Sequence, residues 1–215
     1  MNIIAEFGVN WKTVDQADFM MGQAMNLRIK HIKFQLWKPE QVPEEVRTMH
    51  ITKSIAKHFV ELGKYYGQEV FFTCYYPEAI EICKNLDVNF YKVRYNDRRN
   101  LSLLTPLIDM KKKIFVSCFD PRDTIYHLHA QTEDIVFLRC DPHYPSKSII
   151  PYIKEWAHHG KGIKGFSDHT TDLKLYKSAL ESGMEWFEVH VCLDKETAYE
   201  GKWSKTFEEL KEVLK

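Results

Sequence analysis

Short apolar runs, rich in β-branched and aromatic residues, alternate with amphipathic segments along the whole chain. The runs have the length and composition of buried strands and cover residues 2–7, 31–37, 69–75, 90–95, 113–118, 134–140, 162–168 and 186–193. The amphipathic segments predict helices over residues 14–26, 44–66, 77–86, 101–110, 121–130, 148–159, 171–183 and 205–214. Near-continuous apolar strands that alternate with helices are typical of a parallel sheet covered by helices. Eight such units predict an α/β fold, a compact (β/α)8 TIM barrel forming a single domain over residues 1–215, with a doubly wound open sheet as the alternative.

Charge and composition narrow the classes of partner. The 30 basic and 30 acidic residues balance, so no overall charge favours nucleic acid. No apolar run reaches membrane-spanning length, and the first residues lack a signal peptide. The five cysteines form no CxxC motif, and four fall in predicted strands, which indicates buried free thiols. We therefore expect a cytoplasmic protein with neither a nucleic-acid nor a membrane partner.

Polar side chains interrupt the apolar strands near their carboxyl ends, where barrel active sites lie. Lys33 and Gln35 share one face of the second strand, and Lys92 and Arg94 share one face of the fourth. Others fall near the ends of later strands: Ser117, Arg139 and Asp141. Because a barrel interior is normally apolar, polar residues at these positions indicate a functional site. Ammonium and hydroxyl groups that converge on one site suit a substrate with phosphate and carboxylate groups.

Two histidines also fall at the carboxyl ends of predicted strands. Ser167 and His169 share one face of the seventh strand, and Glu188 and His190 share one face of the eighth. The helix between them makes a βαβ crossover, so the strands are parallel and are expected to be neighbours. Two imidazoles at adjacent strand ends suggest a divalent-metal site. Hydrogen-bonded core histidines are the alternative interpretation.

Six segments, in order and spacing, resemble the N-acetylneuraminate (sialic acid) synthase family. They are residues 4–10 (IAEFGVN), 32–35 (IKFQ), 91–93 (YKV), 140–145 (CDPHYP), 165–170 (GFSDHT) and 188–194 (EVHVCLD). The resemblance covers nearly the whole chain, and the two histidines have the 21-residue spacing of the family pattern. It implies a barrel that condenses phosphoenolpyruvate with a sugar aldehyde, such as N-acetylmannosamine, and releases phosphate.

The resemblance also implies roles for individual residues. His169 and His190 would hold a divalent metal, Mn or Mg, that polarises the aldehyde. The catalytic residues would be Glu6, Lys92 and Glu188. The substrate-binding residues would be Lys33, Gln35, Ser117, Tyr144 and Ser167. The sequence lacks the family's usual C-terminal antifreeze-like domain, so a homo-oligomer or a separate chain would complete the sugar site.

Two alternatives remain open on the same barrel. An aldolase-type enzyme would use Lys92 as a Schiff-base nucleophile. A non-catalytic protein would retain a sugar or phosphate site without the chemistry. Departures from the family pattern at Trp11, Tyr95 and Pro142 motivate both alternatives.

Overall fold

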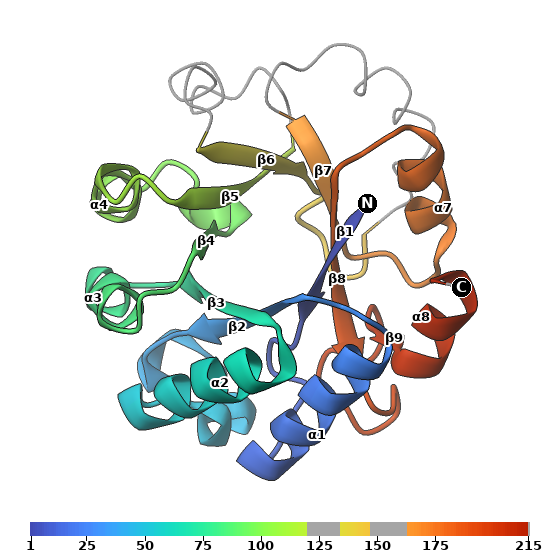
Figure 1. The fold of residues 1–215 in the computed structure, drawn as a ribbon, viewed down its shortest axis with the longest axis horizontal. Coiled ribbons are helices and arrows are strands. Elements are labelled where there is room, and N and C mark those ends of the chain that lie inside the picture. Colours follow the sequence, from blue (N-terminus) through green and yellow to red (C-terminus); the bar gives the residue numbers. More distant parts are fainter. Residues whose placement is uncertain (120–133, 147–162, 215) are drawn as a thin grey trace.

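The chain folds into a closed barrel with helices around it (Figure 1). The structure is a computed structural model that describes residues 1–119, 134–146 and 163–214. Each barrel strand pairs in parallel with the next along the chain, and β1 also pairs with β8, which closes the ring. The barrel strands are β1 (Asn2–Glu6), β2 (His31–Leu36), β3 (Glu69–Cys74), β4 (Phe90–Val93), β5 (Lys113–Cys118), β6 (Ile135–Arg139), β7 (Ile163–Asp168) and β8 (Trp186–Cys192). The ring confirms the predicted (β/α)8 barrel and excludes the open sheet.

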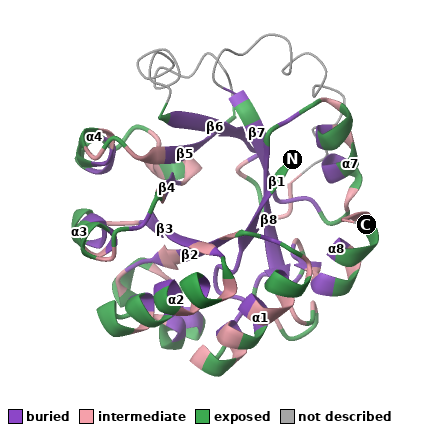
Figure 2. Cartoon of the chain, viewed as in Figure 1, coloured by how far each residue is buried: buried purple, intermediate pink, exposed green. Residues whose placement is uncertain are grey.

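Helices cover the outside of this ring. They are α1 (Val14–Asn26), α2 (Lys53–Tyr66), α3 (Pro77–Asn85), α4 (Leu101–Asp109), α7 (Lys174–Glu181) and α8 (Phe207–Val213). Their inward faces are buried against the strands, whereas their outward faces are exposed (Figure 2). The helices predicted over residues 121–130 and 148–159 lie outside the described residues. Within the described part of the chain, no helix has the length and apolar character to cross a bilayer.

Three predicted elements are divided differently in the structure, and side-chain caps explain two of these differences. The expected helix over residues 44–66 is a 3₁₀ helix, η2 (Glu44–Met49), followed by α2, because the Thr52 hydroxyl accepts from Ile55 N and starts a new helix. At the C-terminus, β9 (Lys205–Thr206) pairs with β8, and Thr206 caps α8 by a capping box with Glu209. The end of the strand predicted over residues 90–95 is instead the 3₁₀ turn η3 (Tyr95–Asp97). A further short 3₁₀ helix, η1 (Pro39–Gln41), follows β2.

The barrel interior toward the amino ends of the strands is filled by a layer of buried aromatic side chains. Phe115 packs with ring centroids 5.7 Å from Phe71, 5.7 Å from Phe90 and 4.7 Å from Trp186. Buried aliphatic side chains complete the layer: Ile4, Val136 and Leu138. A second, larger apolar core lies between the outside of the ring and the helices. All five cysteines are buried free thiols, as predicted.

A polar layer lies two residues further along the same strands. Because side chains two positions apart share a face, Ile4 is followed by Glu6, Phe71 by Thr73 and Phe115 by Ser117 on the barrel interior. Gly165 lets β7 and β8 approach closely here, since a Cβ at this position would collide with the backbone carbonyl of Trp186. That approach sets Ser167 beside Glu188, its register partner on β8. The strand register therefore collects polar side chains at the carboxyl end of the barrel.

Candidate functional site

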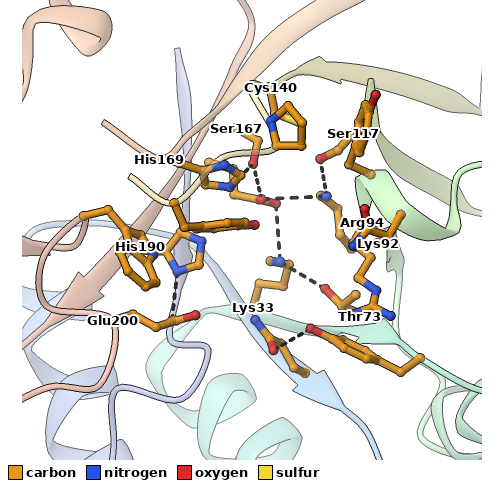
Figure 3. Close-up of a pocket in the computed structure, with 18 residues that line it drawn as sticks. Lys33, Thr73, Lys92, Arg94, Ser117, Cys140, Ser167, His169, His190 and Glu200 are labelled. Atoms are coloured by element: carbon orange, nitrogen blue, oxygen red, sulfur yellow. Dashed lines mark hydrogen bonds and ion pairs between the residues drawn. The ribbon is translucent and has the colours of Figure 1, made fainter. Parts of the chain in front are cut away.

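The polar layer forms the floor of a cavity of about 330 Å³ at the carboxyl ends of the strands (Figure 3). Most of the predicted site residues line it: Lys33, Gln35, Lys92, Ser117, Tyr144, Ser167, His169, Glu188 and His190. Figure 3 shows His169 and His190 on one side of the cavity, and Lys92 and Ser117 on the other. The fold therefore brings these predicted side chains together, although their strands are distant along the chain.

Two buried lysines flank one carboxylate on this floor. Lys33 Nζ lies 3.6 Å from one oxygen of Glu188, and Lys92 Nζ lies 3.7 Å from the other. Lys33 also donates to Thr73 Oγ1 at 3.0 Å, and Lys92 donates to Ser117 Oγ at 2.6 Å. Each ammonium group therefore contacts one hydroxyl and the carboxylate of Glu188. These contacts hold both lysines in place without a substrate.

Glu6 contacts two residues that line the cavity but does not line it itself. Its side chain is fully buried and forms an ion pair with Lys33. Its Oε1 accepts a 2.9 Å hydrogen bond from Gln35, and Gln35 Oε1 accepts a 2.8 Å bond from the hydroxyl of Tyr75. Glu6 therefore contacts two residues predicted to bind substrate, and its own predicted catalytic role stays a prediction.

For Lys33 and for Glu188, burial and the neighbouring charges act on the pKa in opposite directions. Desolvation lowers the pKa of Lys33 to about 8, although Glu188 opposes the shift. Burial alone would raise the pKa of Glu188, but the ammonium groups of Lys33 and Lys92 and the hydrogen bond from Ser167 lower it to about 2. Glu188 is therefore a carboxylate at neutral pH, and Ser167 Oγ donates to it at 2.7 Å.

The two histidines face each other with ring centroids 5.4 Å apart. His169 Nδ1 donates to the backbone carbonyl of Asp141 at 2.8 Å, and His190 Nδ1 lies 3.0 Å from Glu200 Oε2. Because a carbonyl can only accept, His169 carries its proton on Nδ1 when neutral, which leaves Nε2 as the free lone pair. Burial, reinforced by His190, lowers the pKa of His169 to about 3, so this ring is neutral.

This arrangement fits part of a metal site. Histidine ligands usually donate the remaining ring N–H to a carbonyl or carboxylate, as both rings do here. Within the described residues, however, no cluster of three or more His, Cys, Asp or Glu side chains could hold a metal ion. The two imidazoles therefore fit a cation only if other ligands complete its coordination.

Aromatic side chains enclose the histidines at the mouth of the cavity. The ring of Tyr144, which is about half exposed, lies 4.0 Å from His169 and 6.0 Å from His190. Trp203 packs edge-on against Tyr144 at 5.3 Å and His190 at 6.4 Å. Tyr144, which the family resemblance predicts to bind substrate, thus lies directly beside the two histidines.

The sequence interpretation missed five lining residues: Thr73, Tyr75, Asn96, Glu200 and Trp203. Thr73 follows Phe71 on the same strand face, so strict alternation could have indicated it. Glu200 and Trp203 belong to the loop between β8 and β9, where no periodic pattern marks a residue. Of the residues noted near the end of the sixth strand, Asp141 contributes its backbone carbonyl to His169.

Comparison with known proteins agrees with this geometry. The model of the NeuB family matches residues 23–215, whereas no curated protein matches the chain. Among solved structures, N-acetylneuraminic acid (sialic acid) synthetase from Leptospira borgpetersenii serovar Hardjo-bovis, in complex with citrate, has a TM-score of 0.89 at 21% identity, covering 99% of this chain and 80% of that one.

Two further structures share the fold. The spore coat polysaccharide biosynthesis protein spsE from Bacillus subtilis has a TM-score of 0.85 at 19% identity, covering 99% of this chain and 66% of its own. A truncated 3-deoxy-D-arabino-heptulosonate 7-phosphate synthase from Thermotoga maritima has a TM-score of 0.76 at 14% identity, covering 100% of this chain and 84% of that chain. At such low identities these structures show the fold alone, but the family model covers most of the sequence. The chain belongs to the NeuB family.

Proposed function

We propose that the protein condenses phosphoenolpyruvate with an aldose such as N-acetylmannosamine, in the manner of a sialic acid synthase. Family membership supports the reaction class. The observation that carries the proposal is the pair of buried ammonium groups on either side of Glu188, opposite the imidazoles of His169 and His190 in one cavity. Such a floor suits a small substrate with two anionic groups.

The donor would lie on the lysine side of the cavity. Lys33 and Lys92 would contact its phosphate and carboxylate groups, and the hydroxyls of Ser117 and Ser167 would add neutral donors. These groups are fixed by existing hydrogen bonds, so little reorganisation is needed when the anion binds. Glu6 would act through Lys33 and Gln35, which it holds in position.

The acceptor would lie on the histidine side, next to Tyr144. His169 and His190 would hold a divalent cation, Mn or Mg, through their Nε2 atoms, with the remaining ligands supplied by substrate or water. When bound, such a cation supplies Lewis-acid polarisation of a carbonyl group. Tyr144 and Trp203 would shield that side of the cavity from water.

In the reaction, C3 of phosphoenolpyruvate forms a bond to the aldehyde carbon, and water adds to C2. The tetrahedral intermediate then loses inorganic phosphate by C–O cleavage, which yields a keto acid. Glu188, a carboxylate at neutral pH, would orient the attacking water by accepting a hydrogen bond from it, and Lys92 Nζ would stabilise the negative charge that develops nearby. The two protons of the water end on the new hydroxyl group of the acceptor and on the departing phosphate. One phosphoenolpyruvate, one aldose and one water thus give one keto acid and one phosphate.

The aldolase alternative requires Lys92 as a neutral amine. Lys92 Nζ instead donates to Ser117 and to the carbonyl of Val93 and pairs with Glu188, which are the surroundings of an ammonium group. Borohydride trapping with pyruvate tests this alternative, and the synthase proposal predicts no covalent adduct. The non-catalytic alternative predicts ligand binding without turnover.

The direct test is phosphate release from phosphoenolpyruvate with Mn²⁺ and a panel of aldoses that includes N-acetylmannosamine. We expect release that depends on the aldose and is lost in Lys92→Met. Lys57→Met, which removes an exposed lysine on α2, is the matched control and should retain full activity. Folded, metal-loaded protein that releases no phosphate with any aldose would refute the synthase proposal.

A further inference from the structure

Arg94 is a third cationic side chain in the cavity, and the donor site described above does not use it. Its guanidinium carbon lies over the ring of Tyr75, 3.8 Å from the centroid, and its Nε donates to Asp97. Asp97 is the only carboxylate paired with it among the residues that the structure describes. An arginine has five N–H donors in a planar fork, and the contacts with Asp97 and Tyr75 fix its orientation without using all of them, so donors remain for a ligand.

A continuous chain of contacts holds Arg94 in this orientation. Tyr75, on which it stacks, donates to Gln35, and Gln35 donates to Glu6, which pairs with Lys33. The arginine is therefore linked through three side chains to the lysine at the floor. A guanidinium clamped by a ring on one side and a carboxylate at one edge is preorganised for a planar, bidentate contact with an anion.

Arg94 lies closer to the mouth of the cavity than the two lysines. It follows Lys92 by two residues and continues the same face beyond the end of β4, about 6–7 Å along the strand direction. Its side chain is 38% exposed, whereas those of Lys33 and Lys92 are 5% and 2% exposed. Tyr95 and Asn96 line the cavity beside it. The cavity therefore has cations at two depths.

Phosphoenolpyruvate carries two anionic groups, a phosphate and a carboxylate, which the two buried lysines match one to one. We propose that Arg94 binds a third anionic group, a phosphate or carboxylate at the far end of an acceptor that reaches from the histidine side across the mouth of the cavity, so that an anionic aldose is preferred over a neutral one such as N-acetylmannosamine. This inference rests on the proposed function, because it assumes that the donor occupies the floor. It assigns Arg94 to acceptor specificity.

The test is a binding titration that needs no turnover. Sorbitol 6-phosphate, sorbitol and gluconate, none of which has an aldehyde, are titrated by calorimetry into protein saturated with phosphoenolpyruvate and Mn²⁺. We expect at least one of the two anions to bind about 10- to 100-fold more tightly than sorbitol, as expected for a charge-assisted arginine contact. The comparison of sorbitol 6-phosphate with gluconate distinguishes a phosphate site from a carboxylate site.

Two variants make the assignment specific. Arg94→Gln should remove the preference for the anion while changing the affinity for phosphoenolpyruvate by less than about twofold. Arg47→Gln removes an exposed arginine whose Nε is likewise held, by the carbonyl of Pro39, outside the cavity, and should behave as wild type. An anion preference that persists in Arg94→Gln, or is absent in the wild type, overturns the proposal.

The remaining outcomes separate the two proposals. If Arg94→Gln weakens phosphoenolpyruvate binding instead, Arg94 belongs to the donor site and the acceptor assignment is wrong. If neutral aldoses support phosphate release and no anion preference exists, the synthase function stands and only this inference fails. If Arg94-dependent binding is found but no aldose of either kind supports release, the synthase function fails while the anion site stands.

Discussion

The aromatic layer and the polar layer of the barrel are built by the same strands but differ in almost every physical respect. Phe71 and Thr73, or Phe115 and Ser117, are separated by one side-chain repeat on a single face. The aromatic layer excludes water and stabilises the barrel by burying ring surface. The polar layer buries charged groups, whose desolvation costs free energy that their pairing only partly offsets. The difference is the one expected if the aromatic layer serves stability and the polar layer serves the ligand proposed above.

The largest expected effect comes from breaking the polar layer at its centre. Lys92→Met should lower turnover by at least about 10³-fold, because a preorganised charge beside the reacting groups is lost. It should also lower the free energy of unfolding by about 3–5 kcal/mol, since a buried carboxylate, Glu188, loses one of its two ammonium partners. Phosphate release and urea unfolding measure the two effects.

A second substitution then separates stability from function. In Lys92→Met combined with Glu188→Met, an apolar pair replaces the ion pair, so most of the lost stability should return while activity stays absent. Activity that returned together with stability would contradict the assignment of these two residues to the chemistry.

A substitution in the aromatic layer should lower stability while leaving substrate binding nearly unchanged. Phe115→Ala removes a fully buried ring that contacts three other rings, and we expect the free energy of unfolding to fall by about 3–5 kcal/mol. The KM values of the protein that remains folded should change little. Phe19→Ala, at a 57% exposed ring, is the control and should leave urea unfolding nearly unchanged. A large change in KM with unaltered stability would show that the two layers are not separate.

The contrast between the layers also explains which features the sequence could predict. The count of strands and helices follows from periodicity alone, and the closed barrel followed from that count. The junction within residues 44–66 could not be seen, because the apolar pattern continues across Thr52 and only its capping hydrogen bond separates η2 from α2. Periodicity reports which face is buried, but not where a helix starts.

For the site, polar residues inside strands were detectable because they break an apolar pattern. Lys33, Lys92, Ser167 and Glu188 are of this kind, and the structure brings them together. Glu200 was not detectable, since its loop has no pattern to break and it lies ten positions after His190, beyond the end of β8. The absence of Glu6 from the cavity lining was equally hidden, because alternation along β1 shows which face a side chain occupies but not which neighbours cover it.

Glu200 offers the next test, at the edge of the polar layer. Glu200→Gln removes the negative charge beside His190 Nδ1 but retains an amide oxygen, so the ring should lose basicity without losing its orientation entirely. We expect Mn²⁺ affinity to fall about 10- to 100-fold, measured by calorimetry in the absence of substrate. Glu196→Gln, an exposed glutamate of the same loop, is the matched control. Unchanged affinity would separate Glu200 from the histidine site.

The smallest expected effect is a pH dependence set by Lys33 in the polar layer. Burial lowers its pKa to about 8, and an anion binds the protonated form, so affinity for phosphoenolpyruvate should be nearly constant around pH 7 and fall as the pH rises through about 8. The apparent Kd should increase about tenfold by pH 9, a range in which the phosphate ester itself no longer titrates. Lys33→Arg keeps a permanent charge, so its titration should lack this decline even if its affinity is lower. A wild-type profile that is flat to pH 10 would mean that Lys33 keeps its proton and that its neighbouring carboxylates, Glu6 and Glu188, outweigh its burial.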